Sequence, residues 1–194
     1  MARAQRTPFV ILGLLALSGR RPRSGYEIRK VIDTVISSFW HESEGQIYPA
    51  LEHLAASGAI KVQSETKKGR KKTLYAITAE GRAQLRSWLV APVEVGKPRD
   101  ELILKLMFGS ETEIPDLIRH VEAHRARTEA GLAQCRRWER EGIKNPIRYR
   151  PFVQLTVRAG VHLCEANLRW AEETLQSLAA MNDAARTINP AKKT

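Results

Sequence analysis

The sequence predicts a mainly α-helical protein with one small β-hairpin, organised as two domains. Apolar residues recur at helical spacing over most of the 194 residues. Two short segments with alternating apolar and polar residues, at 60–63 and 73–78, flank a turn rich in lysine and arginine. A heptad pattern of apolar residues runs along the last predicted helix, as in helices that pack against a partner helix.

Composition and charge limit the classes to which the chain can belong. Its hydrophobic content of 43% fits a globular protein, and its net charge is +11. Residues 1–91 carry 15 Lys and Arg against 7 Asp and Glu, whereas residues 92–194 carry 17 against 14. The basic excess therefore lies in the N-terminal half, and it suits a polyanion such as DNA, RNA or an anionic membrane. No apolar run reaches the roughly 18 residues of a membrane span, so no membrane partner is expected.

The two cysteines, Cys135 and Cys164, have neither the number nor the spacing of a disulfide framework or a metal site. They are expected to be small buried apolar residues, with a redox switch between them as the alternative. Their use suits a reducing environment, so a cytoplasmic location is expected. The apolar run Phe9–Leu17 imitates a signal peptide, but it is expected to form the first helix, which the later elements need as a packing partner.

The N-terminal domain is predicted to begin with three helices. The first runs from Pro8 to about Leu17 and should be buried, because it is apolar nearly all round. The second opens with a capping box at Ser24–Glu27, in which each side chain bonds the other residue's backbone amide. The third begins after Ser43 and stops at Ser57–Gly58, and its inward face carries Ile47, Leu51 and Leu54.

A β-hairpin is predicted to follow the third helix, and a fourth helix, capped by Thr78, should run to about Val90. The tip of this hairpin carries five positive charges, which repel one another unless a negatively charged surface lies against them. The tip is therefore predicted to bind phosphates. An ordinary solvated turn is the alternative. The cationic residues of the tip surround Gly69 and are Lys67, Lys68, Arg70, Lys71 and Lys72.

Two stretches resemble the PadR family of winged-helix transcriptional regulators. These are I-Y-P-A-L-x-x-L at Ile47–Leu54 and G-R-x-x-x-x-Y-x-I-T-x-x-G at Gly69–Gly81. The resemblance covers about Phe9–Leu89. By arrangement alone, the rest resembles the larger of the family's two size classes, in which a multi-helix domain follows the winged helix. The resemblance implies a dimeric DNA-binding repressor or activator, often released by a small molecule, with DNA contacts at Tyr48–Pro49 and Gly69–Arg70.

Each predicted DNA-binding element has its own role. The third helix offers Gln46 and His53 to base edges and Tyr48 to a phosphate. The hairpin adds affinity with little sequence information, and a dimer that neutralises about 6–10 phosphates should give a salt slope of about −5 to −9. The start of the second helix would meet a phosphate, with a plain helix cap as the alternative. The candidate DNA-binding residues are Ser24, Tyr26, Gln46, Tyr48, Pro49, His53, Lys68, Arg70, Lys71 and Lys72.

The C-terminal domain is predicted to consist of α-helices that form a homodimer. The expected divisions are a winged-helix domain at 1–91, a helical dimerisation domain at 98–181 and a flexible tail at 182–194. Helices are predicted at about 102–108, 113–141 and from 151 onward. The partner of the heptad seam is the preceding helix, a second copy of the chain, or both. The predicted dimer seam is Val157, Val161, Cys164, Leu168, Ala171, Leu175 and Leu178.

Aromatic and flexible apolar residues could line a cleft for a small aromatic or amphipathic effector, with plain core packing as the alternative. No cofactor, metal site or catalytic set is predicted. His120 and His124 have the i, i+4 spacing of zinc ligands, but Val121 stands where a metalloprotease needs glutamate. The candidate pocket residues are Trp40, Trp88, Met107, Phe108, Trp138 and Trp170.

Together these patterns favour a sequence-specific regulator that binds double-stranded DNA as a homodimer on a near-palindromic operator. The expected role is that of a ligand-responsive repressor. The alternative is a winged-helix adaptor that docks an acidic protein without specific DNA binding. An enzyme is not expected.

Overall fold

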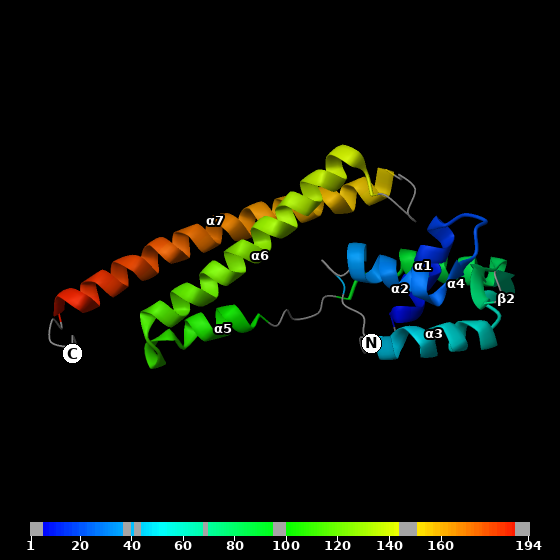
Figure 1. Cartoon of the computed structure of the whole chain (residues 1–194), viewed down its shortest axis with the longest axis horizontal. Coiled ribbons are helices and arrows are strands. Elements are labelled where there is room, and N and C mark those ends of the chain that lie inside the picture. Colours follow the sequence, from blue (N-terminus) through cyan, green and yellow to red (C-terminus); the bar gives the residue numbers. More distant parts are fainter. Residues whose placement is uncertain are drawn as a thin grey trace. The chain divides into compact units, whose positions relative to one another are not determined.

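The computed structural model describes residues 6–36, 40, 44–67, 70–94, 100–143 and 151–188. The chain is mainly helical with a small three-stranded antiparallel sheet, so the predicted fold class is confirmed (Figure 1). It divides into two compact units with the main break after Glu94, here called the N-terminal unit and the C-terminal unit. No helix in the described ranges combines the length and apolarity needed to cross a membrane.

The N-terminal unit combines four helices with the sheet. Its helices are α1 (Thr7–Leu17), α2 (Gly25–Val31), which continues into the π-helical turn η2 (Ile32–Ile36), α3 (Glu44–Ala56) and α4 (Ala79–Val90). Its strands are β1 (Arg23–Ser24), β2 (Ile60–Lys67) and β3 (Arg70–Ile77), in the order β1-β3-β2. The hairpin β2–β3 is called the wing from here on. The strand β1 was not predicted.

The core of this unit lies where the sequence pattern places it. The helix α1 is apolar nearly all round, and it packs against α3 and α4. The helix α3 also packs against α2, and the inward stripes of both helices are buried, because residues spaced three or four apart share one helical face. The largest fully buried apolar side chains are Ile11, Leu12, Leu15, Ile28, Ile32, Ile47, Leu51 and Leu54.

Two glycines fix the path from α3 through the sheet to α4. Gly58 has φ +73°, a left-handed conformation that side chains disfavour, and it ends α3 as predicted. Gly81 lies in the first turn of α4, where an added Cβ would be only 2.1 Å from the carbonyl oxygen of Ala59. Thr78 joins these parts, because its hydroxyl accepts a bond from the Gly81 amide and lies 2.9 Å from the Ala59 carbonyl oxygen. This close approach sets where the wing leaves the helical core.

The C-terminal unit is built on two long helices that pack side by side. It contains α5 (Glu101–Met107), the short turn η3 (Gly109–Glu111), α6 (Ile114–Glu141) and α7 (Pro151–Ile188). The predicted tail from residue 182 is helical as far as Ile188, because Ala184 and Ala185 favour continuation of the helix.

The heptad residues of α7 pack against α6 of the same chain, as the intramolecular alternative expects. One cluster joins Leu117 and Val121 of α6 to Ala171 and Leu178 of α7. A second cluster joins Leu132 and Cys135 of α6 to heptad residues that include Val161, Cys164 and Leu168. The predicted seam therefore packs within one chain, and an additional contact of the same residues with a second copy stays a prediction.

Candidate nucleic-acid interface

The outward face of α3 carries the side chains predicted to meet DNA. Tyr48 is 47% exposed, Pro49 and His53 are also exposed, and Gln46 is half-buried. Pro49 stands inside the helix without breaking it, although it cannot donate a backbone hydrogen bond. The opposite face is anchored in the core, so this helix presents a small polar surface on a rigid support.

The start of α2 is held by the predicted capping box. The Ser24 hydroxyl accepts a 3.3 Å bond from the Glu27 amide, and the Glu27 carboxylate accepts a 2.9 Å bond from the Ser24 amide. Ser24 is only 5% exposed, whereas Tyr26 is 66% exposed. Ser24 therefore shapes this corner, and Tyr26 is the side chain that reaches solvent.

Glu27 also joins this corner to the wing through ion pairs. Its carboxylate lies 3.2 Å from a guanidinium nitrogen of Arg21, 3.9 Å from one of Arg23 and 3.4 Å from the ammonium of Lys72 on β3. Burial acts to raise the pKa of Glu27. The bonds from Ser24 and the charge of Lys72 outweigh burial, so the pKa is lowered and the carboxylate stays charged.

Tyr48 of α3 and Lys72 of the wing both border the first turn of α2. A Cβ built on Gly25 would lie 3.1 Å from Cε1 of the Tyr48 ring, so the ring rests on that turn. Two residues further on, Glu27 holds Lys72. Burial, followed by the proximity of Tyr48 and Glu52, raises the pKa of Tyr75 on β3, which also places α3 close to the wing. The helix α3 and the wing thus share one side of the unit.

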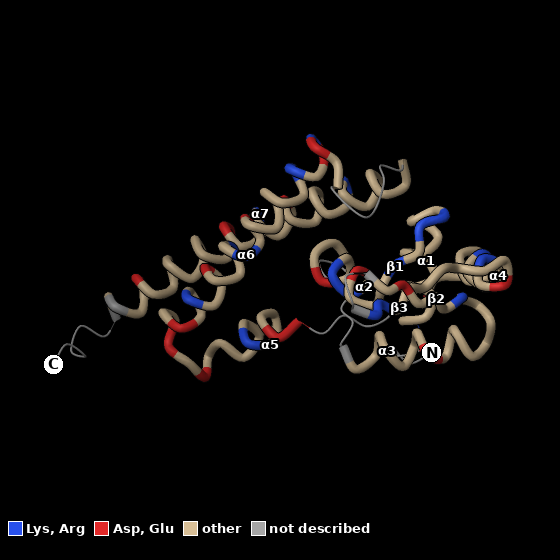
Figure 2. Tube along the Cα trace, turned by 45° about the vertical axis from the view of Figure 1, so that its right-hand side comes forward, with Lys and Arg blue, Asp and Glu red and all other residues tan. Residues whose placement is uncertain are grey.

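The wing is a regular antiparallel hairpin whose strands pair from Ile60 with Ile77 to Lys67 with Arg70. Lys71 and Lys72 are both exposed, and they point to opposite faces because side chains alternate along a strand. Lys71 shares the face of Tyr75. The basic positions of β3 and of the segment before β1 can be followed in Figure 2. Lys68 and the side chain of Arg70 lie outside the described residues.

The six predicted pocket residues are divided between the two units. In the N-terminal unit, Trp88 stacks on Phe9 with ring centroids 5.1 Å apart, and the Arg6 guanidinium lies over the Trp40 ring. In the C-terminal unit, Trp170 packs in one apolar cluster and Trp138 in the other. These four rings have local partners, which agrees with the plain packing alternative.

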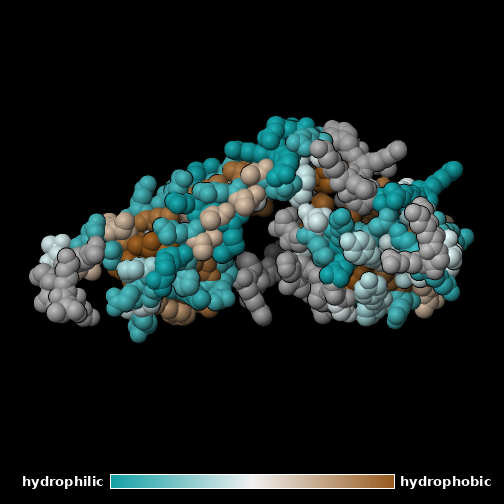
Figure 3. Space-filling model, viewed as in Figure 1, coloured by the Kyte–Doolittle hydropathy of each residue, from teal (hydrophilic) through white to brown (hydrophobic). Residues whose placement is uncertain are grey.

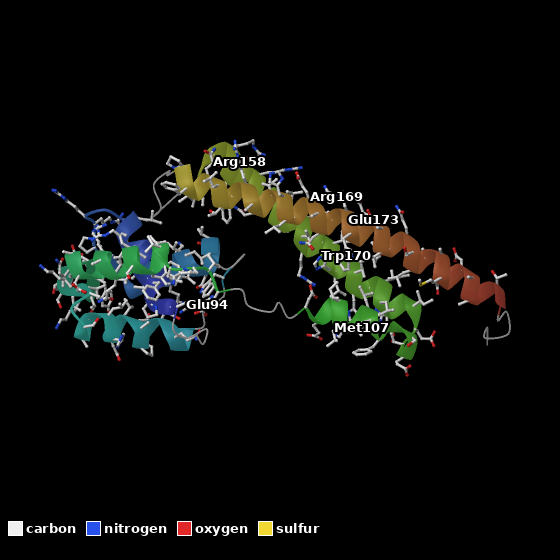
Figure 4. All side chains as sticks on the ribbon, turned by 180° about the vertical axis from the view of Figure 1, so that it is seen from behind. Glu94, Met107, Arg158, Arg169, Trp170 and Glu173 are labelled. Atoms are coloured by element: carbon white, nitrogen blue, oxygen red, sulfur yellow. The ribbon has the colours of Figure 1, made fainter. Side chains whose placement is uncertain are left out.

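The remaining two candidates, Met107 and Phe108, are exposed at the end of α5. Met107 and Trp170 come from different helices of the C-terminal unit (Figure 4). His124, one of the two histidines at zinc-ligand spacing, is half-buried, and its ring forms a T-shaped contact with Trp170, with centroids 5.6 Å apart. Among the described residues, no group of three or more His, Cys, Asp or Glu side chains gathers as a metal would require.

Apolar surface is also exposed on the C-terminal unit (Figure 3). On α7, Phe152, Leu155 and Leu163 are exposed. They are spaced three and then eight residues apart, about one and two helical turns, so they lie on the side of α7 away from the seam. The exposed large apolar residues of α5 and the turn after it are Ile103, Leu104, Met107 and Phe108.

Two features of the site were not predicted from the sequence. One is Glu27 as the centre of three ion pairs, and the other is the pairing of β1 with β3, through Arg23 with Tyr75 and Ser24 with Leu74. The capping box pointed to Glu27 as a helix residue. Its partner Lys72 is 45 positions away, so no local pattern could indicate the pair.

Two family models match the chain, one for each part. The model of the transcriptional regulator PadR-like family matches residues 12–87, and the model described as virulence activator alpha C-term matches residues 98–179. A probable transcriptional regulator of Mycobacterium tuberculosis, Rv1176c, is 25% identical over 80% of this chain and 89% of its own length.

Solved structures of similar fold cover nearly the whole chain. The PadR-like transcriptional regulator BC1756 from Bacillus cereus is 27% identical with a TM-score of 0.73, over 90% of this chain and 99% of its own. PadR from Bacillus subtilis, solved in complex with operator DNA, is 22% identical with a TM-score of 0.74, over 88% of this chain and 98% of its own. The same PadR has been solved with p-coumaric acid, at 21% identity and a TM-score of 0.66, over 88% of this chain and 99% of its own.

Proposed function

We propose that this chain, which belongs to the PadR-like family of transcriptional regulators, is a homodimer that binds a near-palindromic operator through α3 and the wing. The family consists of transcriptional regulators rather than enzymes, in agreement with the expectation from the sequence. The observation that carries the proposal is the shared position of Tyr48 and Lys72 at the first turn of α2.

The two elements would divide the work of binding. A helix with small and hydrogen-bonding residues on its outward face can enter a major groove, and Gln46 and His53 would contact base edges there. The wing would place Lys71 and Lys72 on the neighbouring phosphates, which adds affinity for any sequence. Glu27 would keep the wing at a fixed angle to the recognition helix.

Selection of bound duplexes from a random pool tests this function. A regulator should enrich one motif with two half-sites about 34 Å apart, and Gln46→Ala should relax its sequence preference by about 1–3 kcal/mol at one position. An adaptor that docks an acidic protein should enrich no motif, and unrelated duplex should compete as well as any selected one. That second result would refute the proposal.

The homodimer would use surfaces that the α6–α7 packing leaves open. The outward stripe of α7 with Phe152, Leu155 and Leu163 and the exposed face of α5 are the available apolar surfaces. Leu163→Glu should shift the chain toward monomer in analytical ultracentrifugation. Gln176→Glu, a charge change at an exposed position on another side of α7, is the matched control. Equal association of both variants would exclude this face.

The proposed effector is a small aromatic or amphipathic compound. The likeness to p-coumaric acid-bound PadR extends to the fold alone, so the ligand must be tested directly. Quenching of tryptophan fluorescence by phenolic acids, together with a loss of operator affinity, is expected. Unchanged fluorescence and unchanged affinity over a panel of such acids would remove the effector from the proposal while leaving DNA binding intact.

The proposed sign of regulation is repression. A reporter placed behind the selected operator should become more active when the chain is absent and when the effector is present. Lower reporter activity in the absence of the chain would instead identify an activator. That role would fit the virulence activator family whose model matches residues 98–179.

A further inference from the structure

The two cysteines of the chain face each other across the long helices of the C-terminal unit. Cys135 lies on α6 and Cys164 on α7, both are free thiols, and they belong to one apolar cluster. Each sulfur lies over a glycine of the opposite helix. A Cβ on Gly160 would be 3.0 Å from Sγ of Cys135, and a Cβ on Gly131 would be 3.6 Å from Sγ of Cys164.

This arrangement brings the two thiols together. Each glycine precedes the cysteine of its own helix by four residues, about one helical turn, so the helices pass closely at two successive levels. Both thiols lie in the same apolar cluster of this helix interface. Two thiols at adjacent levels of one helix interface can be joined by a disulfide when side-chain rotation and a small adjustment of the helices bring their Cβ atoms to about 3.8 Å.

The two thiols differ in reactivity. Burial raises the pKa of both thiols, and the nearby Cys164 raises that of Cys135 further. Cys135 is only 7% exposed, whereas Cys164 is half-buried. Cys164 is therefore the more accessible thiol and the better nucleophile, and Cys135 is placed to react second.

We propose that Cys135 and Cys164 form an oxidation site, at which a hydroperoxide converts the two thiols into a disulfide that fastens α6 to α7. This inference does not depend on the proposed DNA binding, because the site lies wholly within the C-terminal helices. In a reducing compartment such a bond is transient, and thiol exchange with a cellular dithiol would restore the free thiols.

The reaction balances without a cofactor. The thiolate of Cys164 attacks the terminal oxygen of the hydroperoxide, an S–O bond forms as the O–O bond breaks, and the leaving alkoxide takes the proton that the thiol released. The thiolate of Cys135 then attacks the sulfenic sulfur, an S–S bond forms as the S–O bond breaks, and hydroxide leaves as water with the proton from Cys135. Two thiols and one hydroperoxide give one disulfide, one alcohol and one water.

The disulfide would stabilise the folded unit. It closes the loop from residue 135 to residue 164 and so removes freedom from the unfolded chain. A rise in the Tm of about 5–10 °C between the reduced and the oxidised protein is expected.

The test uses the full-length, folded and reduced chain, exposed to hydrogen peroxide, alkylated and measured by intact mass after denaturation. The expected product is lighter by two hydrogen atoms, takes up no alkylating reagent, migrates as a monomer without reductant and reverts with dithiothreitol. The chain has only two cysteines, so an intramolecular disulfide has one assignment. Cys135→Ser should accumulate a sulfenic acid trapped by dimedone, and Cys164→Ser should accumulate far less.

Three results would overturn the proposal. The first is a folded chain that keeps two alkylatable thiols under peroxide treatment that oxidises the urea-unfolded chain. The second is a disulfide that joins two chains instead of two helices of one chain. The third is an oxidised protein with the same Tm as the reduced one, because the bond would then not fasten the helix pair.

Discussion

Lys72 and Lys105 form a matched pair for locating the DNA-binding surface. Each lysine side chain is 47% exposed and pairs with a glutamate, Lys72 with Glu27 at 3.4 Å and Lys105 with Glu101 at 2.9 Å. Replacement by alanine removes one positive charge of equal exposure in each case. The first charge lies on the wing, and the second lies on α5.

Lys72→Ala should lower DNA affinity in a salt-dependent way. One lost phosphate contact per protomer is two per dimer, so the slope of log affinity against log salt should become shallower by about 1.8. At about 0.1 M salt the same relation gives a decrease in DNA affinity of about eightfold for each lost phosphate contact and about sixtyfold for the dimer. These are upper values, because Glu27 already neutralises part of the Lys72 charge. Lys105→Ala should change neither quantity.

Fluorescence anisotropy of a labelled duplex over a series of salt concentrations measures both quantities. The loss should be the same for a selected operator and an unrelated duplex, since phosphate contacts carry no sequence information. A slope for Lys72→Ala that matches the unmodified protein, or an equal loss for Lys105→Ala, would refute the assignment of the wing to DNA.

Three further predictions concern stability. Gly81→Ala should destabilise the chain by about 1–3 kcal/mol or more in urea unfolding, because its Cβ would meet the Ala59 carbonyl oxygen, whereas Gly131→Ala should stabilise it by about 0.5–1 kcal/mol. Glu27 has a lowered pKa in the folded state, so its stabilisation is present above its ordinary pKa of 4.5 and is lost as the pH falls through the lower folded value. When Tm is measured against pH in the acid range, the decrease caused by protonation of Glu27 should be absent in Glu27→Gln. The same Tm profile for both proteins would contradict this contribution of Glu27. Phe9→Leu should shift the fluorescence emission of Trp88. It should also lower the free energy of unfolding by about 0.5–1.5 kcal/mol more than the loss of buried apolar surface explains, and identical emission spectra would argue against the stacked pair.

Local signals in the sequence were enough to place most elements of the fold. The Ser24–Glu27 capping box, the stop at Gly58 and the Thr78 cap of α4 were all predicted and are present. Each depends on side chains and backbone groups only a few residues apart. The inward stripe of α3 was predicted for the same reason, because helical spacing alone decides which residues share a face.

Features that depend on distant parts of the chain could not be predicted in the same way. The two-residue strand β1 exists because Arg23 and Ser24 meet β3, and the wing is anchored because Lys72 meets Glu27. The heptad pattern of α7 indicated a partner helix without identifying it. The packing of α6 onto α7 supplies that partner within one chain.

Because α6 fills the seam of α7, each copy of the chain keeps an apolar core in its C-terminal half when it stands alone. Separation of two copies then requires no unfolding, in contrast to obligate dimers whose subunits lose their structure on dilution. Protein concentration in the cell could thus set the fraction of paired chains and, with it, occupancy of a two-part operator. Synthesis and turnover of the chain would then be a second control of gene expression, alongside any ligand.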